Sequence, residues 1–344
     1  MSTAPTPAAV LRPGRSGRRG EGRVLIVKLS SLGDVVHAMP AVQDVRRAWP
    51  NLHIDWVVER AFAPLVARCE GVERVIPVDL RRWRKAPFAD STRRAWRAFR
   101  EDLTAHAYDV VVDLQGLSKS ALVARLAHLK PLGRRYAMAN RTEGSGYEAP
   151  TRWVADVAIR LEPHVHAVQR ARLVCAQAFS YQVDGPARFG LVSHPVTPQR
   201  ATVALVHGSS RADKQWPRTH WLELGRMLNA QGFRVALVHG NEAERLASEA
   251  MAQALPDAEV WPAMELDRLI DHLAGCAGVV GVDSGISHIA VALDVPHLQI
   301  YNFDTAWRTG PQALGAHRQI SVYAMPHPTI DAVWQEWESL AVQP

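Results

Sequence analysis

A single carboxylate stands after the first apolar run of the chain, where it could act as a base. Residues 24–27 form a short run of Val, Leu and Ile, a small polar loop follows, and Asp34 lies where a helix should begin. In an open α/β sheet, ligands bind outside the carboxyl ends of the strands. Asp34 is therefore either the cap of a helix or a group that takes a proton from a substrate, and the local sequence leaves both interpretations open.

Two further polar loops follow apolar runs in the second half of the chain. They carry hydroxyl, ammonium and carboxylate groups: Ser209, Ser210 and Lys214 in the first loop, and Asp283, Ser284, Gly285 and His288 in the second. A lysine ammonium and the free N–H groups of a helix N-terminus both bind phosphate, and a carboxylate accepts hydrogen bonds from sugar hydroxyls. Each loop alone would also fit a solvated turn or a simple cap. Because both follow strands of one sheet, we favour a joint anion site.

Two residues beyond neighbouring strands are weaker candidates for the same ligand. Glu242 could bond a ribose, and Met264 could pack on a base. A methionine in such a place more often fills the core.

A run of cations follows the third apolar run of the chain. It contains Arg81, Arg82, Arg84 and Lys85 around a tryptophan. Four cations in five residues cannot form a buried face, and such runs are usually solvated. Their position at the predicted carboxyl edge of the sheet favours contact with an anionic acceptor, because guanidinium groups bind carboxylates and phosphates bidentately.

The charge of the chain is unevenly distributed. Of the formal net charge of +6, residues 1–22 carry +3 and residues 81–100 carry +7, which leaves the remainder at −4. A basic segment on a mildly acidic body fits an anionic substrate or membrane surface better than nucleic acid. The composition is that of a globular protein, and no run of 18 apolar residues is present.

Several classes of site have no sequence signal. The three cysteines are scattered singly, His164 and His166 do not share a helix face, and no Asp-rich cluster occurs, so we expect no metal site. A G-x-G-x-x-G after a strand and a Walker A motif are both missing, which disfavours a nicotinamide-dependent oxidoreductase, the main alternative outside the transferases.

The pattern of apolar runs predicts two doubly wound α/β domains facing across a cleft. We expect a disordered extension at 1–22, a first domain at 23–182, a Pro- and Gly-rich linker at 183–200, a second domain at 201–328, and a helix within 329–344 that could cross back to the first domain. Helices are expected at 61–69, 118–129 and 151–161, among others, and the scattered cysteines fit a reducing cytoplasm.

With these loops placed, the chain resembles the lipopolysaccharide heptosyltransferases of glycosyltransferase family 9. The resemblance rests on the Asp34 loop (27–40), Asp-Trp-Val-Val-Glu (55–59), Glu-Arg-Val-Ile-Pro-Val (73–78), Arg-Arg-Trp-Arg-Lys (81–85), Asp-Leu-Gln-Gly-Leu-Ser-Lys-Ser (113–120), the Lys214 loop and Val-Asp-Ser-Gly-Ile-Ser-His (282–288). The segments 81–85 and 115–120 are most similar to members that add the first heptose to Kdo. The alternative is a member of the heptosyltransferase II type, which acts on a later inner-core acceptor.

The resemblance implies a GT-B fold and an inverting, metal-independent transfer of L-glycero-D-manno-heptose from ADP-heptose to Kdo of Kdo2-lipid A. It implies no cofactor, no nucleic acid, and a cytoplasmic location at the periphery of the inner membrane. By position, Asp34 matches the catalytic base. The donor-site matches are Ser209, Ser210, Lys214, Glu242, Met264, Asp283, Ser284, Gly285 and His288. For the acceptor we expect contacts from Ser31, Gly33, Arg81, Arg82, Arg84, Lys85 and Gln115. Residues 301–305 depart from the family pattern, so no contact is transferred there.

Overall fold

The computed structural model describes residues 22–312 and 319–344. Of the extension expected to be disordered, 1–22, residues 1–21 lie outside this range, and Gly22 begins the first strand. The described chain divides into two compact units: the first holds the residues up to Leu29, Pro40–Val66 and Gly71–Gly185, and the second holds Ser30–Met39, Ala67–Glu70 and Pro186–Pro344. The main boundary, between residues 185 and 186, falls inside the segment predicted as a linker.

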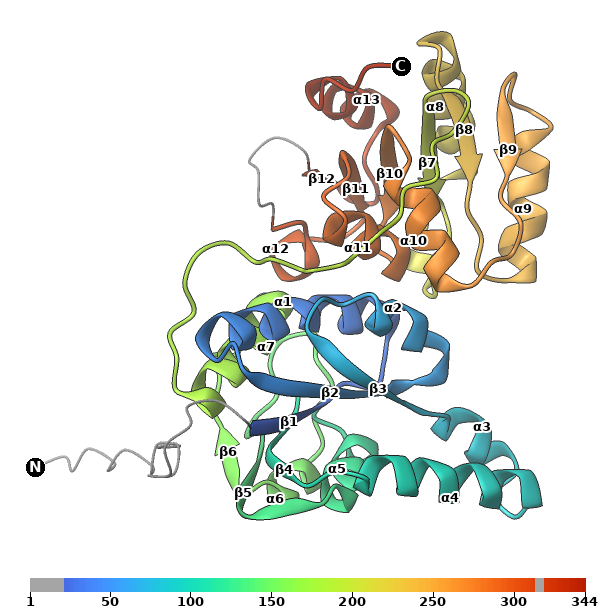
Figure 1. The fold of residues 1–344 in the computed structure, drawn as a ribbon. Helices are drawn as coiled ribbons and strands as arrows, with labels where there is room; N and C mark the ends of the chain where they lie inside the picture. Colours follow the sequence, from blue (N-terminus) through green and yellow to red (C-terminus); the bar gives the residue numbers. More distant parts are fainter. Residues whose placement is uncertain (1–21, 313–318) are drawn as a thin grey trace, which may run out of the picture. The chain divides into compact units, whose positions relative to one another are not determined.

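The first unit is built on a six-stranded parallel sheet of order β3-β2-β1-β4-β5-β6 (Figure 1). Its strands are β1 (Gly22–Val27), β2 (Leu52–Glu59), β3 (Val72–Val78), β4 (Tyr108–Asp113), β5 (Leu129–Met138) and β6 (Val157–Ile159). The intervening helices are α1 (Leu32–Ala48), α2 (Ala63–Ala67), α3 (Leu80–Lys85), α4 (Asp90–Thr104), α5 (Ser118–Leu126), α6 (Pro150–Val154) and α7 (Ala167–Phe179).

Both faces of this sheet are covered, which explains the continuous apolar runs of its central strands. Leu25 and Val27 of β1 pack in one core cluster with Phe99 and Leu103 of α4 and with residues of α5. Successive side chains of a strand point to opposite faces. The residues between them, such as Ile26, are equally buried and belong to the other face, which α7 contacts.

The second unit repeats the strand order of the first. Its six-stranded parallel sheet reads β9-β8-β7-β10-β11-β12, which is the first order with each strand number raised by six. The strands are β7 (Thr202–Val206), β8 (Arg234–Leu237), β9 (Ala258–Val260), β10 (Gly278–Val282), β11 (His297–Tyr301) and β12 (Gln319–Tyr323). The helices are α8 (Arg218–Ala230), α9 (Glu242–Ala252), α10 (Leu266–Ala274), α11 (Gly285–Ala292), α12 (Ala306–Thr309) and α13 (Ile330–Ser339).

The C-terminal helix α13 belongs to the second unit. The sequence had left open that it could cross back to the first domain. Instead Val333 and Trp337 are buried in the core of the second unit, where α13 contacts α8, β11 and β12. The Trp337 ring also lies where a side chain at Gly278 would be, so the helix is fitted to β10.

The segment predicted as a linker is hydrogen-bonded over much of its length. The N–H of Glu70 donates to the carbonyl of Gly190, and the N–H groups of His194 and Val196 both donate to Asp271. Asp271 also forms a bidentate ion pair with Arg68, at 2.9 and 3.1 Å. The Pro- and Gly-rich composition therefore marks an irregular but well-anchored segment.

Several predicted helices are shorter than expected, and two of them end where a partly exposed strand begins. The predicted helix at 151–161 is the single turn α6 followed by the strand β6, and the predicted helix at 118–129 ends at Leu126, before β5. The predicted helix at 61–69 shortens to α2. Strands β5, β6, β9 and β12 are partly exposed, so they lack the continuous apolar run that identifies a buried strand.

Candidate functional site

Asp34 lies in the first turn of α1 and caps it. Its Oδ2 accepts hydrogen bonds from the backbone N–H of Ser31 at 3.2 Å and from the Ser31 hydroxyl at 2.9 Å. A carboxylate at this position that reaches back to the residue before the helix is one half of a capping box. The cap interpretation is therefore correct, and the half-buried carboxylate is held in a defined direction.

A buried network at the ends of β1 and β4 supports the loop that leads to Asp34. Gln115 Oε1 accepts a hydrogen bond from the N–H of Leu29 at 3.0 Å, and Lys28 Nζ donates to the carbonyl of Leu114 at 3.2 Å. Asp113 accepts the N–H groups of Gln115 and Gly116, at 2.8 and 3.2 Å. We expected Gln115 to bind the acceptor; the structure gives its side-chain oxygen a role in the loop.

Complete burial governs the protonation of Asp113. Burial raises the pKa of Asp113 to about 6, although the hydrogen bonds from Gln115, Gly116 and Ser120 lower it. The strands β1 and β4 are the point where the strand order of the sheet reverses, and ligands bind at such a switch point. A carboxyl group here that titrates near neutrality therefore links the local structure of the site to pH.

The predicted acceptor cations form the short helix α3. Trp83 is buried against Trp96 and Phe99 of α4, with ring centroids 5.5 and 5.7 Å away. This anchor leaves the flanking residues exposed: Arg81, Arg82, Arg84 and Lys85. Their exposure agrees with the expectation that this run cannot form a buried face, and the contact with an anionic acceptor stays a prediction. Helix α3 directly follows the carboxyl end of β3.

Glu59, at the carboxyl end of β2, is a candidate that sequence reasoning missed. Its side chain is buried, and its Oε1 has no hydrogen-bond partner among the described residues. Burial raises the pKa of Glu59, while the charges of Lys119 and Arg81 lower it. A buried carboxylate oxygen without a partner is costly, so it marks a place where a ligand hydroxyl or a water is expected. The available signal was a carboxylate directly after a buried strand, as for Asp34.

The second sheet carries an ion pair at its own switch point, between β7 and β10. Lys214 Nζ lies 2.6 Å from Asp283 Oδ2, and His288 Nε2 lies 3.2 Å from Asp283 Oδ1. Burial alone would raise the pKa of Asp283. The hydrogen bonds and charges of His288 and Lys214 outweigh it and hold the pKa of this carboxyl well below its usual range. Three residues predicted for the donor site are thus brought together.

The two loops around this ion pair are fixed by local hydrogen bonds. Ser284 is the N-cap of α11 and accepts the N–H of Ser287 at 3.4 Å, while the Ser287 hydroxyl donates to the carbonyl of Val282 at 2.6 Å. Asn302 Nδ2 donates to the carbonyls of Asp213 and Gln215, on either side of Lys214, at 3.0 and 2.9 Å. The segment 301–305, where the sequence departs from the family pattern, therefore braces the Lys214 loop.

Two positions of the predicted site must be glycine, because a side chain there would clash with a neighbour within the second unit. A Cβ on Gly33 would lie 2.6 Å from the His288 ring, and one on Gly285 would lie 2.8 Å from the side chain of Leu32. The His37 and His288 rings are 4.2 Å apart. Gly33 and Gly285 therefore serve the packing of the site, and Gly33 has no side chain with which to bind the acceptor.

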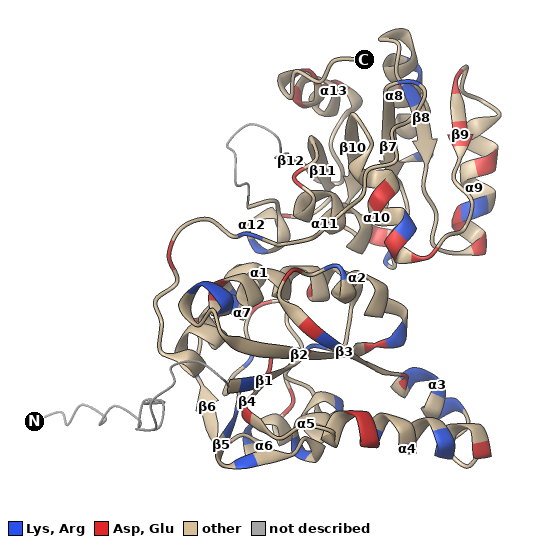
Figure 2. Cartoon of the chain, viewed as in Figure 1, with Lys and Arg blue, Asp and Glu red and all other residues tan. Residues whose placement is uncertain are grey.

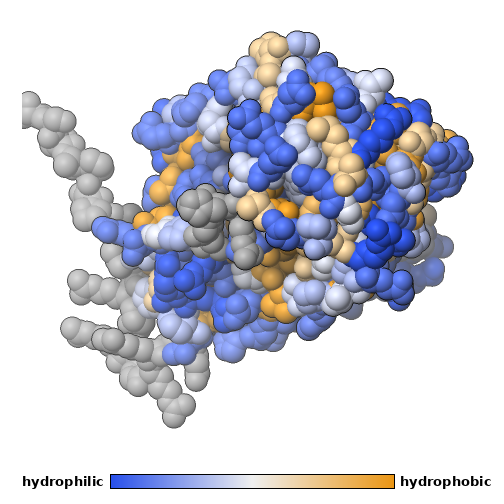
Figure 3. Space-filling model, turned by 90° about the horizontal axis from the view of Figure 1, so that it is seen from above, coloured by the Kyte–Doolittle hydropathy of each residue, from blue (hydrophilic) through white to orange (hydrophobic). Residues whose placement is uncertain are grey.

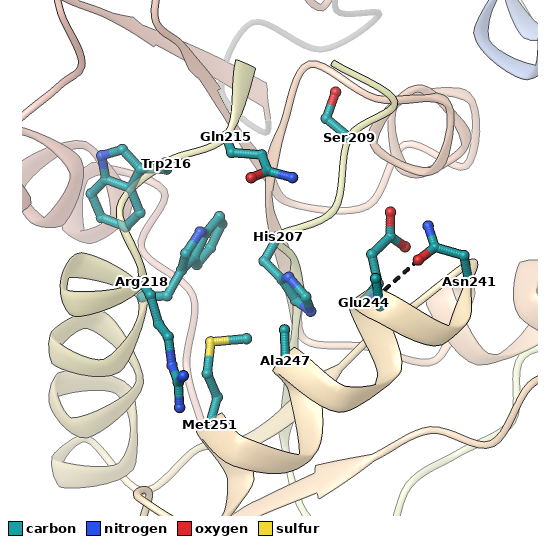
Figure 4. A pocket seen from close by; sticks show the side chains of 11 residues that line it. His207, Ser209, Gln215, Trp216, Arg218, Asn241, Glu244, Ala247 and Met251 are labelled. Atoms are coloured by element: carbon teal, nitrogen blue, oxygen red, sulfur yellow. Dashed lines mark hydrogen bonds between the residues drawn. The ribbon is translucent and has the colours of Figure 1, made fainter. Parts of the chain in front are cut away.

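A pocket of about 380 Å³ opens between the Lys214 loop and the start of α9 (Figure 4). Its lining combines polar groups with aromatic and apolar ones: His207, Ser209, Gln215, Trp216, Arg218, Trp221, Asn241, Ala243, Glu244, Ala247 and Met251. Glu244 accepts the N–H of Gly240 at 2.7 Å, and a Cβ on Gly208 would clash with its carboxylate. Burial lowers the pKa of His207, whose Nε2 lies 2.8 Å from Ser248 Oγ.

Not every predicted donor residue lines this pocket. Ser209 does, while Ser210 is exposed on the loop. Glu242 is at the surface, and its carboxylate pairs with Arg245 at 2.6 Å. Met264 is half-buried and is not among the residues that line the pocket. The donor assignments of Glu242 and Met264 stay predictions, and Glu244, two residues along the helix, is the glutamate that the structure places at the pocket. Among the described residues, no group of three or more His, Cys, Asp and Glu side chains is arranged to hold a metal ion.

The two sheets and their polar carboxyl edges define a doubly wound α/β protein of the class that includes nucleotide-dependent transferases. The chain belongs to glycosyltransferase family 9 (heptosyltransferase), whose model matches residues 96–330. It is 40% identical over 286 residues to lipopolysaccharide heptosyltransferase 1 of Escherichia coli K12, covering 81% of this chain and 87% of the relative. It is 36% identical over 311 residues to the enzyme of the same name from Pseudomonas aeruginosa, covering 88% and 83%.

The structural comparison agrees with the sequence. The structure of Escherichia coli heptosyltransferase WaaC with ADP is similar over 92% of this chain and 99% of that chain, with a TM-score of 0.82 and 34% identity. The fold is thus GT-B. Relatives named heptosyltransferase 2 match this chain at 23 to 26% identity.

Proposed function

We propose that this protein transfers L-glycero-D-manno-heptose from ADP-heptose to Kdo of Kdo2-lipid A. The observation that carries the proposal is the 40% identity to an enzyme named lipopolysaccharide heptosyltransferase 1 over most of both chains. The lower identity to heptosyltransferase 2 enzymes favours the first heptose addition over a later one. The Lys214–Asp283 pair beside the N-terminus of α11 supports a donor diphosphate on the second sheet.

In the proposed mechanism, Asp34 takes the proton of the attacking Kdo hydroxyl. The hydroxyl oxygen bonds to the anomeric carbon of heptose from the face opposite ADP, and the bond to the diphosphate breaks, which inverts the configuration. The transition state is oxocarbenium-like, as in other glycosyl transfers. The hydrogen bonds from Ser31 fix the carboxylate's direction before substrate binds. A base positioned in this way contributes about 10²–10⁴ in rate.

The leaving diphosphate gains negative charge as the bond breaks. We assign its stabilisation to the Lys214 ammonium and to the free N–H groups at the start of α11, the role that a metal has in other transferases. For Lys214 to reach a phosphate it must share or leave Asp283, so the ion pair is the resting arrangement of the donor site. On the first sheet, the cations of α3 would hold the anionic groups of the acceptor.

The proposed reaction also implies where in the cell the protein acts. A lipid acceptor and a water-soluble nucleotide sugar meet only at a membrane surface, so we propose a peripheral protein on the cytoplasmic face of the inner membrane. Among the described residues, no helix is both long and apolar enough to cross a bilayer.

Mass spectrometry of the lipid product tests the function directly. Kdo2-lipid A incubated with the protein and ADP-heptose should gain the mass of one heptose, and should gain nothing without the donor. A second arm uses an acceptor that already carries the first heptose. Extension of this acceptor with no reaction on Kdo2-lipid A would overturn the proposed acceptor in favour of the heptosyltransferase II type.

A further inference from the structure

The helices α4, α5 and α6 of the first unit carry exposed apolar side chains that the proposed chemistry does not use. They are Phe88 in the turn before α4, Leu122 on α5 and Trp153 on α6, with exposed fractions of 83%, 50% and 74%. Figure 1 shows the three helices along one side of the first sheet, and α5 contacts both α4 and α6. Large apolar groups gathered on neighbouring helices mark an interaction surface.

Each of these apolar side chains has an exposed cation close by in the sequence. Arg125 follows Leu122 by three residues, which places both on one side of α5, and Arg152 directly precedes Trp153. Phe88 lies between the cations of α3 and those of α4. The combination of aromatic or aliphatic groups with arginine is that of segments that lie in the interface of a bilayer.

Helix α4 carries four arginines, Arg93, Arg94, Arg97 and Arg100, against three acidic residues, Asp90, Glu101 and Asp102. Phe99 and Leu103 are buried in the core of the first unit, while Arg93, Arg94 and Arg97 are exposed. Figure 2 shows blue bands on α3 and both blue and red bands on α4. Together α4, α5 and α6 hold seven cations and three acidic residues, a net of +4. One of the acidic residues, Asp90, lies 3.7 Å from Arg93. The excess positive charge is therefore complementary to an anionic surface.

Other surfaces offer a weaker case. In Figure 3, the face of the molecule seen from above shows apolar residues in small patches separated by hydrophilic ones. In the second unit, exposed apolar residues such as Leu246 lie on α9 beside both acidic and basic side chains: Glu242, Arg245 and Glu249.

We infer that the outer face of α4, α5 and α6, with Phe88, Leu122 and Trp153, docks onto an anionic phospholipid bilayer. The arginines contact phosphate headgroups, and the three apolar side chains enter the boundary between headgroups and acyl chains. This inference rests on the proposed function, in which the acceptor is itself a lipid. It assigns membrane contact to α4–α6 and leaves the cations of α3 for the acceptor.

Sedimentation with lipid vesicles tests the surface. Vesicles of phosphatidylethanolamine and phosphatidylglycerol should bind the full chain, and vesicles of phosphatidylcholine alone should bind it much less. Arg94→Gln with Arg97→Gln should weaken binding roughly 25-fold, about fivefold for each arginine near an anionic surface. The matched control, Arg226→Gln with Arg268→Gln on exposed positions of the second unit, should leave binding unchanged.

A second pair of variants tests the contribution of the apolar side chains to vesicle binding. Trp153→Ser should weaken binding severalfold at any salt concentration, because the loss is of apolar contact, whereas the arginine effect should shrink as salt rises. Leu246→Ser on α9 is the control and should bind as the unmodified protein does. Equal vesicle binding by all these variants would overturn the inference, as would retention of DNA without retention of anionic vesicles.

Activity on a lipid-free acceptor separates this inference from the proposed function. With a soluble Kdo disaccharide, the variants at residues 94, 97 and 153 should turn over like the unmodified protein, because the lipid surface is not involved. A raised KM for the soluble sugar would show that α4 binds the acceptor and would refute the membrane assignment. No transfer by the unmodified protein to this sugar or to Kdo2-lipid A would instead refute the proposed function, while the vesicle result would still stand.

Discussion

Removal of the Lys214 ammonium should have two separable consequences, one for stability and one for ADP binding. Lys214 is 20% exposed and Asp283 is 6% exposed, so their 2.6 Å contact is largely shielded from solvent. Lys214→Ala leaves a buried carboxylate with the His288 ring, 3.2 Å from Oδ1, as its remaining close partner. Leaving a buried charged group short of a partner costs roughly 1–3 kcal/mol, and we expect about 2 kcal/mol here.

The loss should depend on pH with a defined sign. The depressed pKa of Asp283 means that its carboxylate stabilises the folded state above the ordinary value of 3.8, and this contribution is lost as the pH falls below it. Without Lys214 the folded-state pKa rises toward 3.8, so the acid-dependent loss should become smaller and be complete at a higher pH, while its onset, which the unfolded state sets, is unchanged. Urea unfolding of both proteins at several pH values measures this change.

ADP affinity is the second measurement. A charge-assisted hydrogen bond to phosphate is worth roughly 1.5–3 kcal/mol, so Lys214→Ala should weaken ADP binding about 10- to 100-fold by calorimetry. The double variant Lys214→Ala, Asp283→Asn has neither charge and should recover most of the lost stability while its ADP affinity stays low. Recovery of both properties would refute the phosphate role and reduce Lys214 to a structural partner. Lys130→Ala, which breaks the more exposed pair with Asp109, is the control and should change neither quantity appreciably.

Three further predictions concern Asp34, in the Ser30–Met39 segment of the second unit, and two groups of residues in the first unit. Asp34→Asn keeps an oxygen that can accept from Ser31, so ADP-heptose affinity by calorimetry should stay within about twofold while kcat falls by about 10²–10⁴, and near-normal turnover would contradict the base assignment. Glu59→Gln should raise the free energy of unfolding at pH 7, because the raised pKa shows that the charged form is disfavoured, yet raise the acceptor KM severalfold; a loss of stability would argue against it. Replacing Arg81, Arg82 and Arg84 with Gln should raise the acceptor KM about tenfold or more and leave the donor KM unchanged, whereas equal changes in both would indicate a folding defect.

The buried central strands could be predicted from the sequence because burial on both faces demands continuous Val, Ile and Leu. This holds for β1, β4, β7 and β10, which lie beside the switch points. It fails for β5, whose first seven residues include Lys130, Gly133 and Arg134 and are at least partly exposed. A strand with one solvated part has no such run, and its pairing depends on neighbours that are distant in sequence.

The sequence predicted where the candidate site residues lie in the fold, but not which of their side chains contact one another. The location of Asp34, Lys214 and Asp283 at the ends of apolar runs followed from the parallel topology. The Lys214–Asp283 pair joins residues 69 apart, and only the pairing of β7 with β10 brings them together. Likewise, whether Glu242 or Glu244 lines the pocket depends on which side of α9 faces it. The two glutamates are only two residues apart, so the sequence alone does not distinguish them.

The shared strand order of the two sheets has a consequence for how this protein can evolve. Two copies of one architecture, each with its own core and its own loops at the carboxyl edge, would under the proposed function separate the inheritance of donor preference from that of acceptor preference. On the proposed assignment, substitutions after β7 and β10 would change the nucleotide sugar without disturbing the core of the first sheet, and substitutions after β2, β3 and β4 would do the same for the acceptor. Selection for a new glycan can therefore act on one half of the gene at a time.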